Sequence, residues 1–571
     1  MNSPIATRQG VIPIASTGRR QGPKVRGTSK GRTVDPAAME EVRALLGDAP
    51  RRRDLLIEHL HRIQDAYGYL PATHLVALAA EMRLPMTEVY EVATFYHHFD
   101  VVKEGERAPP KLTVRVCDSL SCAMAGARGL LDELPARLGE NVRVVPAPCV
   151  GRCHAAPVAL VGWNPVDHAT ADSVGDAVAT GAFRPAVAPY IDYGQYRAAG
   201  GYRTLVECVS GQRTLDDVLG TMESSALRGL GGAGFPAGRK WRIVRAEPAP
   251  RLLAVNIDEG EPGTFKDRHY LERDPHRFLE GMLIAAWAVD IAEIYIYLRD
   301  EYAGCRELLA RELGALSADP PCPLPTIHLR RGAGAYICGE ESAMIESIEG
   351  KRGMPRLRPP YVAQVGLFGR PTLEHNMETL FWVRDILEKG AAWFADQGRN
   401  GRKGLRSFSV SGRVQKPGVH LAPAGITLRE LVDEYCGGML PGHELYAYLP
   451  GGASGGILPA SLADIPLDFD TLNAHGCFIG SAAVMVLSQH DRARDAALNV
   501  MEFFAEESCG KCTPCRVGTA KAVRLLQAPR WDQPLLAELS QAMADASICG
   551  LGQAAPNPIL CVMKYFPHEI A

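Results

Sequence analysis

Eight of the 15 cysteines in this 571-residue chain stand in two groups whose spacing suits metal binding. Each group joins closely spaced thiols to thiols much farther along the chain. The first group is Cys117, Cys122, Cys149 and Cys153, and the second is Cys509, Cys512, Cys515 and Cys549. Thiolates arranged in this way ligate iron–sulfur clusters or zinc ions.

The pattern within each group favours a cluster. Two cysteine pairs suit a [2Fe–2S] cluster, whereas zinc sites usually show the shorter Cys-x2-Cys spacing. Three thiolates at x2 spacing, which we expect on one tight turn, suit a [4Fe–4S] cluster with a distant fourth. Zinc remains the alternative at both sites. The other seven cysteines are isolated in the sequence, and we expect them to be small buried hydrophobic residues: Cys208, Cys305, Cys322, Cys338, Cys436, Cys477 and Cys561.

A glycine-rich stretch at residues 228–241 could hold a phosphate and a flat ring. Its glycines are Gly229, Gly231, Gly232, Gly234 and Gly238. Because glycine has no Cβ, backbone N–H groups can approach a ligand closely. Lys240 supplies a charge for a phosphate, and Phe235 supplies an aromatic face. Taken alone, the stretch is better explained as a flexible surface loop.

Two further segments place polar residues at the ends of expected elements. A strand at 252–255 runs into the acidic segment 256–267, and a second glycine-rich loop at 332–342 precedes a helix. The three segments lie within about 115 residues, at the edges of alternating strands and helices, where a doubly wound domain binds its ligand. The carboxylates would repel a phosphate, so we assign them to sugar hydroxyls or to the charge around a reacting ring.

The elements that position the first cysteine group follow a definite order. Residues 39–99 carry apolar side chains at helical spacing, which predicts a bundle of short helices. The next expected elements are a strand at 112–116, a helix at 125–138 and strands at 142–145 and 158–161. This β-α-β-β order, with cysteines at the strand ends, resembles the thioredoxin-like ferredoxin fold.

Composition excludes several classes of protein. A net charge of −3 gives no support for a nucleic-acid partner held by charge, and 46% hydrophobic content suits several cores. The most apolar run, 282–298, is interrupted by Asp290 and Glu293, so we expect no membrane span. The tail is basic and acid-free over its first 33 residues, and Arg19-Arg20 lacks a following apolar segment, which argues against export. We expect a cytoplasmic protein; a mitochondrial targeting segment is the weaker alternative.

Four motifs together carry a resemblance to a known family. They are Arg-Gly-x-Gly-Gly-Ala-Gly-Phe-Pro from Arg228, Asp-Glu-Gly-Glu-Pro-Gly-Thr-Phe-Lys-Asp from Asp258, Gly-Ala-Gly-Ala-Tyr-Ile-Cys-Gly-Glu-Glu from Gly332, and Glu-Ser-Cys-Gly-x-Cys-x-Pro-Cys-Arg from Glu507. This set resembles the flavin subunit of respiratory complex I. Residues 36 to about 185 resemble the smaller [2Fe–2S] subunit of that complex, fused in front.

The resemblance implies a multidomain α/β and α architecture. Its segments are 1–35, a disordered basic tail; 36–105, a helical bundle; 108–185, a thioredoxin-like [2Fe–2S] domain; 186–205, a linker; 206–400, a doubly wound FMN/NAD-binding domain; 401–490, a β-grasp (SLBB-like) domain; and 491–571, a helical [4Fe–4S] domain. The β-grasp segment is expected to be a spacer without catalytic residues.

The same resemblance implies the cofactor contacts. FMN is expected to contact Gly229, Gly231, Gly232, Lys240, Asn256, Asp258, Glu259, Gly339, Glu340 and Asn376. Phe235 would stack on NAD, with Glu261 and Glu341 facing the same dinucleotide. Three site residues depart from the complex I pattern: Arg358 replaces a lysine, Tyr361 a phenylalanine and His375 an asparagine. No catalytic side chain is expected, because FMN performs the hydride transfer.

Fusions of this kind occur in NAD-reducing hydrogenases and in NAD-dependent formate dehydrogenases that contain molybdenum or tungsten. The chain resembles the formate dehydrogenase β subunit most, given the run 451–459 and the complete first cysteine group. That resemblance implies electrons from formate, oxidised at a metal-pterin site on a partner subunit, reducing NAD⁺ reversibly through the clusters and FMN. A hydrogenase subunit, a fused complex I module and a non-catalytic iron–sulfur sensor or scaffold are the alternatives.

Overall fold

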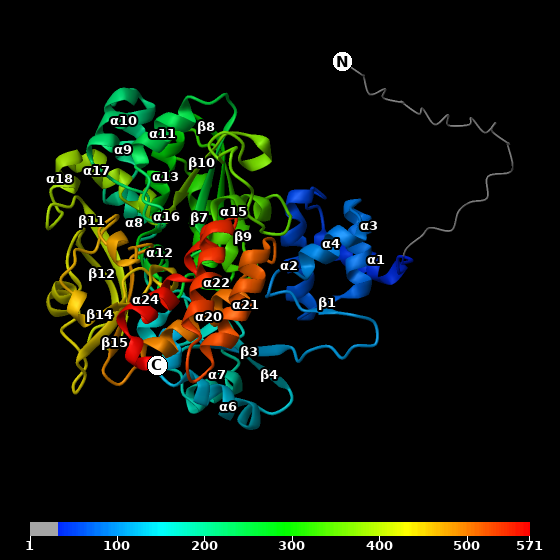
Figure 1. The fold of residues 1–571 in the computed structure, drawn as a ribbon. Coiled ribbons are helices and arrows are strands. Elements are labelled where there is room, and N and C mark those ends of the chain that lie inside the picture. The colour runs from blue at the N-terminus through cyan, green and yellow to red at the C-terminus, as the bar shows by residue number, and fades with distance from the viewer. Residues whose placement is uncertain (1–31) are drawn as a thin grey trace, which may run out of the picture.

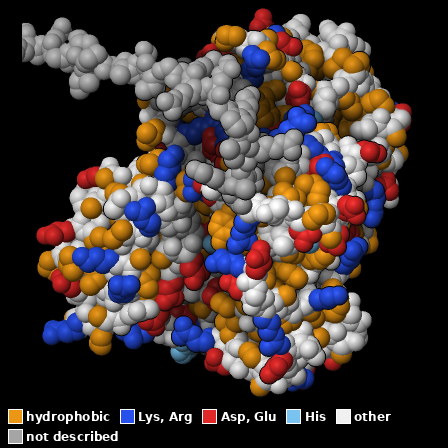
Figure 2. All heavy atoms as spheres, turned by 90° about the vertical axis from the view of Figure 1, so that its right-hand side faces the viewer, with side chains coloured by type: hydrophobic (Ala, Val, Ile, Leu, Met, Phe, Trp, Pro, Cys, Tyr) orange, Lys and Arg blue, Asp and Glu red, His pale blue; other side chains and the backbone are white. Residues whose placement is uncertain are grey.

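The computed structural model describes residues 32–571, so the basic tail expected at 1–35 lies almost wholly outside the described residues. Figure 1 shows the first helices as a lobe at the side of the main body, where the later units pack together. On the face drawn in Figure 2, Lys and Arg side chains are interspersed with Asp and Glu side chains. None of the helices in the described part of the chain is long and apolar enough to cross a membrane.

The N-terminal lobe is a small helical bundle. Its elements are α1 (Pro36–Leu46), α2 (Leu56–Tyr67), α3 (Ala72–Met82) and α4 (Met86–Ala93), with a short parallel pair, β1 (Leu70–Pro71) and β2 (Val101–Val102). In α2, Leu56, Leu60 and Ile63 recur at helical spacing and are buried. The lobe is fixed to the body by Arg330, whose Nη2 lies 2.6 Å from Asp54 Oδ2.

The second unit is a four-stranded sheet of order β4-β3-β5-β6 with helices beside it. Its elements are β3 (Leu112–Cys117), α5 (Leu120–Met124), α6 (Ala127–Leu138), β4 (Val142–Ala147), β5 (Ala159–Val161), β6 (Asn164–Val166) and α7 (Ala171–Ala179). The β3 and β4 strands are parallel, and β5 and β6 continue the sheet antiparallel. The expected β-α-β-β order is therefore confirmed.

The third unit contains a parallel sheet of order β10-β7-β8-β9. Its elements are α9 (Arg203–Val209), α10 (Leu215–Ser224), α11 (Ala237–Arg245), β7 (Arg251–Ile257), α12 (Lys266–Leu271), α13 (Pro275–Val289), β8 (Ile291–Leu298), α14 (Ala303–Ala318), β9 (Thr326–Arg331), α15 (Glu341–Ile348), β10 (Thr372–Asn376), α16 (Met377–Phe381), α17 (Val383–Lys389) and α18 (Ala391–Ala395).

Both faces of this sheet are covered. Leu253 and Val255 face a core that contains α13, whereas Leu252 and Ala254 face the core shared with α15 and the N-terminal bundle. This explains the uninterrupted apolar run of β7, since parallel strands buried on both faces need no polar alternation.

The segment expected to be a linker, 186–205, is partly helical. Helix α8 (Tyr193–Ala198) begins at Asp192, whose side chain caps it together with Gln195. Tyr196 is buried and its hydroxyl donates to Glu280 Oε2 at 2.6 Å. The tyrosines of this segment therefore pack on the domain that contains α13, and the expectation of an irregular linker is wrong for this part.

The last two units close the molecule. A mixed sheet of order β12-β11-β15-β13-β14 is formed by β11 (Leu405–Gly412), β12 (Gly418–Pro423), β13 (Leu445–Leu449), β14 (Leu458–Pro459) and β15 (Ala483–Ser488), with the short helix α19 (Leu428–Glu430). The C-terminal helices are α20 (Ala493–Glu506), α21 (Thr513–Leu526), α22 (Gln533–Ala546), α23 (Gly550–Ala554) and α24 (Asn557–Tyr565). These assignments complete the expected multidomain fold.

Candidate functional site

One cavity of about 790 Å³ opens beyond the C-terminal ends of the parallel strands. Strands β7 and β10 end at its edge, at Ile257 and Asn376. Its far wall comes from loops of the mixed sheet and from the starts of α23 and α24. Position and size match a ligand site in an open α/β sheet.

Every predicted cofactor-binding residue except Tyr361 lines this cavity. The lining residues are Gly229, Gly231, Gly232, Phe235, Lys240, Asn256, Asp258, Glu259, Glu261, Gly339, Glu340, Glu341, Arg358, His375 and Asn376. The structure does not bring Tyr361 to the cavity, because a turn in which Gln364 N donates to Tyr361 O leaves its side chain 56% exposed. Its predicted contact is therefore not supported.

The glycines form a cradle with little spare room. A Cβ on Gly231 would lie 3.0 Å from Asn376 Cβ, and one on Gly339 would lie 3.1 Å from the Asp258 carbonyl oxygen. Gly234 has φ +65°, and a Cβ there would come within 2.6 Å of the Phe469 ring. The backbone can follow this path only because these positions lack side chains.

Two polar side chains on the cavity floor are held by the backbone around them. Lys240 Nζ donates to the Glu374 carbonyl oxygen at 2.7 Å. Asn256 Nδ2 donates to the Gly339 carbonyl oxygen at 2.9 Å, and its Oδ1 accepts from Asp258 N at 3.0 Å. Both side chains are therefore oriented before any ligand arrives.

Asp258 carries a buried carboxyl oxygen that has no hydrogen-bond partner among residues 32–571. Its Oδ2 is one of the few buried polar atoms with no hydrogen bond among the described residues. Burial raises the pKa of Asp258 well above its ordinary value. A polar atom left in this condition is an expected contact for a bound group.

Two neighbouring carboxyl groups, those of Glu374 and Glu341, face the same cavity. Burial, followed by the neighbouring Glu341 carboxylate, raises the pKa of Glu374 to about 8. Arg358 offsets this charge, since its Nη1 lies 2.9 Å from Glu341 Oε1. Sequence reasoning does not predict Glu374 as a site residue, because a single glutamate within a strand gives no signal.

Carboxylates of the acidic turn form hydrogen bonds with other residues of the chain. Glu259 Oε1 accepts from Asp267 N at 2.8 Å, at the start of α12. Glu261 Oε1 accepts from both the backbone and the hydroxyl of Ser454, at 2.8 and 2.6 Å. These two carboxylates therefore shape the cavity wall in the free protein.

His375 occupies one of the three positions that depart from the complex I pattern. Trp241 Nε1 donates to His375 Nε2 at 2.8 Å. Burial lowers the pKa of His375 well below its ordinary value, followed by the charge of Lys240, so the ring is neutral. Trp241 therefore orients the histidine. The sequence shows that a histidine replaces the asparagine here, but it does not predict this hydrogen bond.

Several lining residues are absent from the predicted set. Lys266 Nζ is buried between Asp267, at 2.8 Å, and Glu378, at 3.0 Å. Other unpredicted lining residues are Thr264, Tyr336, Glu374, Ser454, Phe478, Ser481 and Asn557. Lys266 and Thr264 stand inside the quoted acidic motif and could have been found there. Tyr336 stands inside the second glycine loop and Ser454 inside the run 451–459, whereas the others come from separate elements.

The first cysteine group gathers where the ferredoxin-like unit meets the cavity domain. Cys117 ends β3, Cys122 lies in α5, and Cys149 and Cys153 flank Gly151. All four thiols are buried, and the Sγ atoms of Cys149 and Cys153 are 3.3 Å apart. Hydrogen bonds with Cys122 and Cys149 raise the pKa of the Cys117 thiol, which ties the two pairs together.

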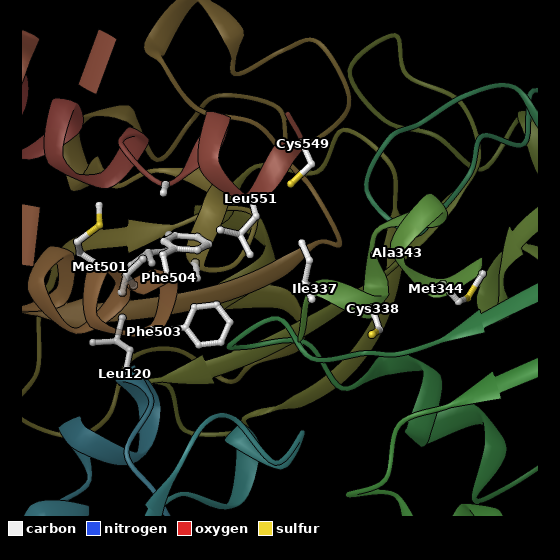
Figure 3. Close-up of a cluster of buried hydrophobic side chains, with 14 of the residues drawn as sticks. Leu120, Ile337, Cys338, Ala343, Met344, Met501, Phe503, Phe504, Cys549 and Leu551 are labelled. Carbon is white, nitrogen blue, oxygen red and sulfur yellow. The ribbon is translucent and has the colours of Figure 1, made fainter. Parts of the chain in front are cut away.

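The second group gathers at the C-terminal helices. Cys509 and Cys512 are half-buried in the loop before α21, Cys515 lies in that helix, and Cys549 precedes α23. The three closely spaced thiols do not share one tight turn, which corrects that expectation, because Cys515 already belongs to a helix. Figure 3 shows Cys549 and Leu551 facing Ile337 of the second glycine loop.

Each group offers four thiols, a ligand set that suits a tetrahedral zinc ion as well as an iron–sulfur cluster.

Both cysteine groups adjoin the cavity wall. Arg299 donates to the Cys149 carbonyl oxygen at 2.7 Å and to the Glu259 carbonyl oxygen at 2.5 Å. On the other side, Gly550 and Leu551, which follow Cys549, line the cavity directly. Groups bound at the three places would therefore be neighbours.

Four family models match the chain in the order of these units. They are the thioredoxin-like [2Fe–2S] ferredoxin at residues 42–181, the Nuo51 FMN-binding domain at 222–385, the SLBB domain at 407–458 and the NADH-ubiquinone oxidoreductase-F iron–sulfur binding region at 495–571. The predicted FMN, [2Fe–2S] and [4Fe–4S] domains are thus confirmed.

Whole-protein comparisons agree. An F subunit of NADH-quinone oxidoreductase from Rhizobium meliloti, numbered 2, is 41% identical over 389 residues, which cover 66% of this chain and 92% of the relative. The F subunit of the same enzyme from Aquifex aeolicus is 40% identical over 390 residues, covering 66% and 89%. A solved NAD⁺-reducing [NiFe]-hydrogenase chain superposes with a TM-score of 0.80 at 33% identity, covering 91% of this chain and 92% of the other.

Proposed function

Because the chain belongs to the family of NADH-quinone oxidoreductase F subunits, we propose that it is the NAD-reducing subunit of a cytoplasmic formate dehydrogenase complex. It is an NAD(H) oxidoreductase module of the diaphorase type, with FMN-binding, [2Fe–2S] and [4Fe–4S] domains. The observation that carries the proposal is the cavity, bordered by both cysteine groups, in which the predicted residues converge.

The cavity fits FMN by its own chemistry. The glycine cradle lets a ligand approach the backbone closely, and Lys240 offers a positive charge for its phosphate. The Oδ2 of Asp258, which has no hydrogen bond within the described part of the chain, can bind a polar atom of the ring or sugar chain. Asn256, Gly339, Glu340 and Asn376 would complete the contacts. Bound FMN supplies hydride exchange with nicotinamide and single-electron exchange with iron–sulfur clusters.

The outer part of the cavity would take the dinucleotide. Phe235 is 41% exposed and can stack on a ring of NAD. Glu341, paired with Arg358, faces the same space, while Glu261 is held by Ser454 and positions the wall. These side chains bind and orient NAD, and none acts as a proton donor or acceptor in the hydride transfer itself.

Formate as the electron source is supported by the run 451–459 and by the complete first cysteine group. Both features lie at the cavity: Ser454 lines it, and Cys149 is bridged to its wall by Arg299. The partner would be a molybdenum- or tungsten-pterin subunit that oxidises formate. Formate itself would never reach this chain.

A second candidate is the NAD-reducing subunit of a hydrogenase. The solved hydrogenase chain covers nearly the whole length of this chain, including the ferredoxin-like unit that precedes the flavin domain. In that case the cavity and its residues would perform the same chemistry, and only the partner subunits would differ.

The test is anaerobic purification of the whole assembly, followed by visible absorbance after separate additions of NADH, formate and hydrogen. We expect NADH and formate to bleach the flavin band and the iron–sulfur shoulder. Bleaching by NADH and hydrogen, but not formate, would assign the hydrogenase instead. An assembly without flavin that ignores NADH would leave a sensor or scaffold and refute the diaphorase proposal.

A further inference from the structure

Two cysteines outside the metal-binding groups lie against each other. The Sγ atoms of Cys477 and Cys561 are 3.5 Å apart, although 84 residues separate them in the chain. Cys477 follows a short 3₁₀ helix (Asn473–His475) in the mixed-sheet domain, and Cys561 lies within α24 of the C-terminal domain. Both are isolated in the sequence, and the fold brings them together.

The pair lies outside both cysteine groups assigned to clusters. Among the described residues, Cys477 Sγ contacts Cys561 Sγ, and Cys561 Sγ also donates to the Gly476 carbonyl oxygen at 3.8 Å. Cys477 is 2% exposed and Cys561 is 3% exposed, which keeps large reagents away and leaves each thiol nearest to the other. Such a pair is suited to covalent chemistry between its two members.

The pair also packs closely against a loop that contributes to the wall of the cavity. A Cβ on Gly456, which has φ +84°, would lie 2.5 Å from Cys477 Sγ and 3.1 Å from Cys561 Sγ. Gly456 belongs to the loop that carries Ser454, the partner of Glu261. Asn557, at the start of α24, donates to the Ser454 carbonyl oxygen at 3.0 Å.

We propose that Cys477 and Cys561 are a redox-active pair that closes to a reversible disulfide between the mixed-sheet domain and α24, with hydrogen peroxide as the oxidant. The disulfide joins the segment that continues into Phe478 to the helix that begins at Asn557. Both of these residues line the cavity. Closing the pair therefore ties together two parts of its wall.

The chemistry balances with one peroxide for each disulfide. The Cys561 thiolate attacks one peroxide oxygen, the O–O bond breaks, and a sulfenic acid and one water form. The Cys477 sulfur then attacks the sulfenic sulfur, forming the S–S bond and releasing a second water. The two thiols lose two electrons and two protons, which reduce the peroxide. A hydrogen bond from Cys477, supported by the charge of Lys564, lowers the pKa of the Cys561 thiol and favours it as the attacking group.

The test uses the intact assembly with its clusters. The protein is exposed anaerobically to hydrogen peroxide, at a dose that leaves the visible iron–sulfur absorbance unchanged, and free thiols are then alkylated. Peptide mass spectrometry without reductant should find the Cys477 and Cys561 peptides linked, two hydrogens lighter than their sum, and separated again by dithiothreitol. Backbone amides of α24 should exchange more slowly with deuterium in the linked form.

Three variants serve as controls. Cys477→Ser and Cys561→Ser should each abolish the linked peptide, whereas Cys436→Ser, which alters another buried cysteine of the mixed-sheet domain, should retain it. The wild-type peptide map does not depend on the folding of any variant. Two thiols that remain fully alkylatable, or that oxidise separately to sulfinic acids without linkage, would overturn the proposal.

Discussion

At the scale of the residue, the site contains carboxyl groups whose pKa is raised by burial. Asp258 has a buried oxygen without a partner among the described residues, and the pKa of Glu374 is raised to about 8 by burial and by Glu341. Both residues lie beside a cradle suited to a polyanionic ligand. A raised pKa favours the uncharged form of a carboxyl, and this form does not repel the phosphate of a ligand.

The first prediction concerns Asp258 and flavin affinity. Asp258→Leu should weaken FMN binding by roughly 10- to 100-fold, because it removes a buried polar contact worth about 1–3 kcal/mol. Asp258→Asn should stay within about threefold of wild type, since the amide keeps a polar group of the same shape at this position. Quenching of FMN fluorescence during reconstitution of the apoprotein gives both constants. Equal affinity in the Leu variant would show that FMN makes no contact there.

The second prediction concerns pH. The folded-state pKa of Glu374 is about 8, against 4.5 for the free side chain, so the native state retains a proton that the unfolded state loses. Its contribution to stability is therefore greatest at acid pH and falls as pH rises from about 4.5 to about 8. Glu374→Gln removes this dependence. The free energy of unfolding of the variant, measured relative to that of wild type, should therefore increase by about 2–5 kcal/mol between pH 5 and pH 9.

This gain is measured by unfolding NAD-free protein across that pH range. The substitution keeps the local hydrogen bond, because the new amide oxygen can still accept from Asn256 Nδ2, which lies 3.2 Å from Glu374 Oε1. The exposed Glu444→Gln is the matched control and should leave the pH profile unchanged. Parallel profiles for wild type and Glu374→Gln would contradict the assignment.

The predictable residues are those that carry a pattern. The cysteine groups and glycine cradle stand at fixed spacings that reflect the geometry of their ligands, so the chain alone can indicate them. Glu374 and Asn557 reach the cavity singly from separate elements, and Cys477 meets Cys561 across 84 residues. No local rule connects such positions, because tertiary packing alone brings them together.

At the scale of the element, the sheet and its covering helices follow from periodicity, whereas irregular segments do not. The apolar run of β7 lies close to its predicted bounds, since burial on both faces of a parallel sheet leaves a plain apolar signal. Helix α8 gives no such signal, because its six residues include a glycine and two tyrosines and its stability comes from packing.

The third prediction tests the packing of α13 beneath the sheet. A Cβ on Gly281 would overlap the Leu380 carbonyl oxygen in α16, where a backbone atom cannot move aside easily. Gly281→Ala should therefore destabilise the domain by more than about 2 kcal/mol and lower its flavin content. Gly314→Ala, also inside a helix but with open space around it, should stabilise by about 0.5–1 kcal/mol. Thermal unfolding measures the stability of both variants. A Gly281→Ala variant as stable as wild type would refute the close contact.

At the scale of the whole molecule, the two cysteine groups differ in their exposure to a partner. All four members of the first group are buried. The second has two half-buried members, Cys509 and Cys512, and a fourth member, Cys549, whose neighbours line the cavity. An electron donor bound to the surface can therefore approach the second group, while the first is reached only through the protein.

The final prediction separates the two groups by function. Cys122→Ser should lose about two iron atoms per chain and Cys549→Ser about four, because each removes one ligand of its own cluster. Bleaching of the flavin by NADH should survive in both variants, since neither residue lines the cavity.

Bleaching by the donor of the partner subunit should survive in Cys122→Ser and be lost in Cys549→Ser, because electrons from the surface enter beside Cys509 and Cys512. Iron analysis and anaerobic absorbance give both readouts, with Cys436→Ser as the unaffected control. Loss of donor-driven bleaching in Cys122→Ser alone would place the entry at the buried group and reverse this order.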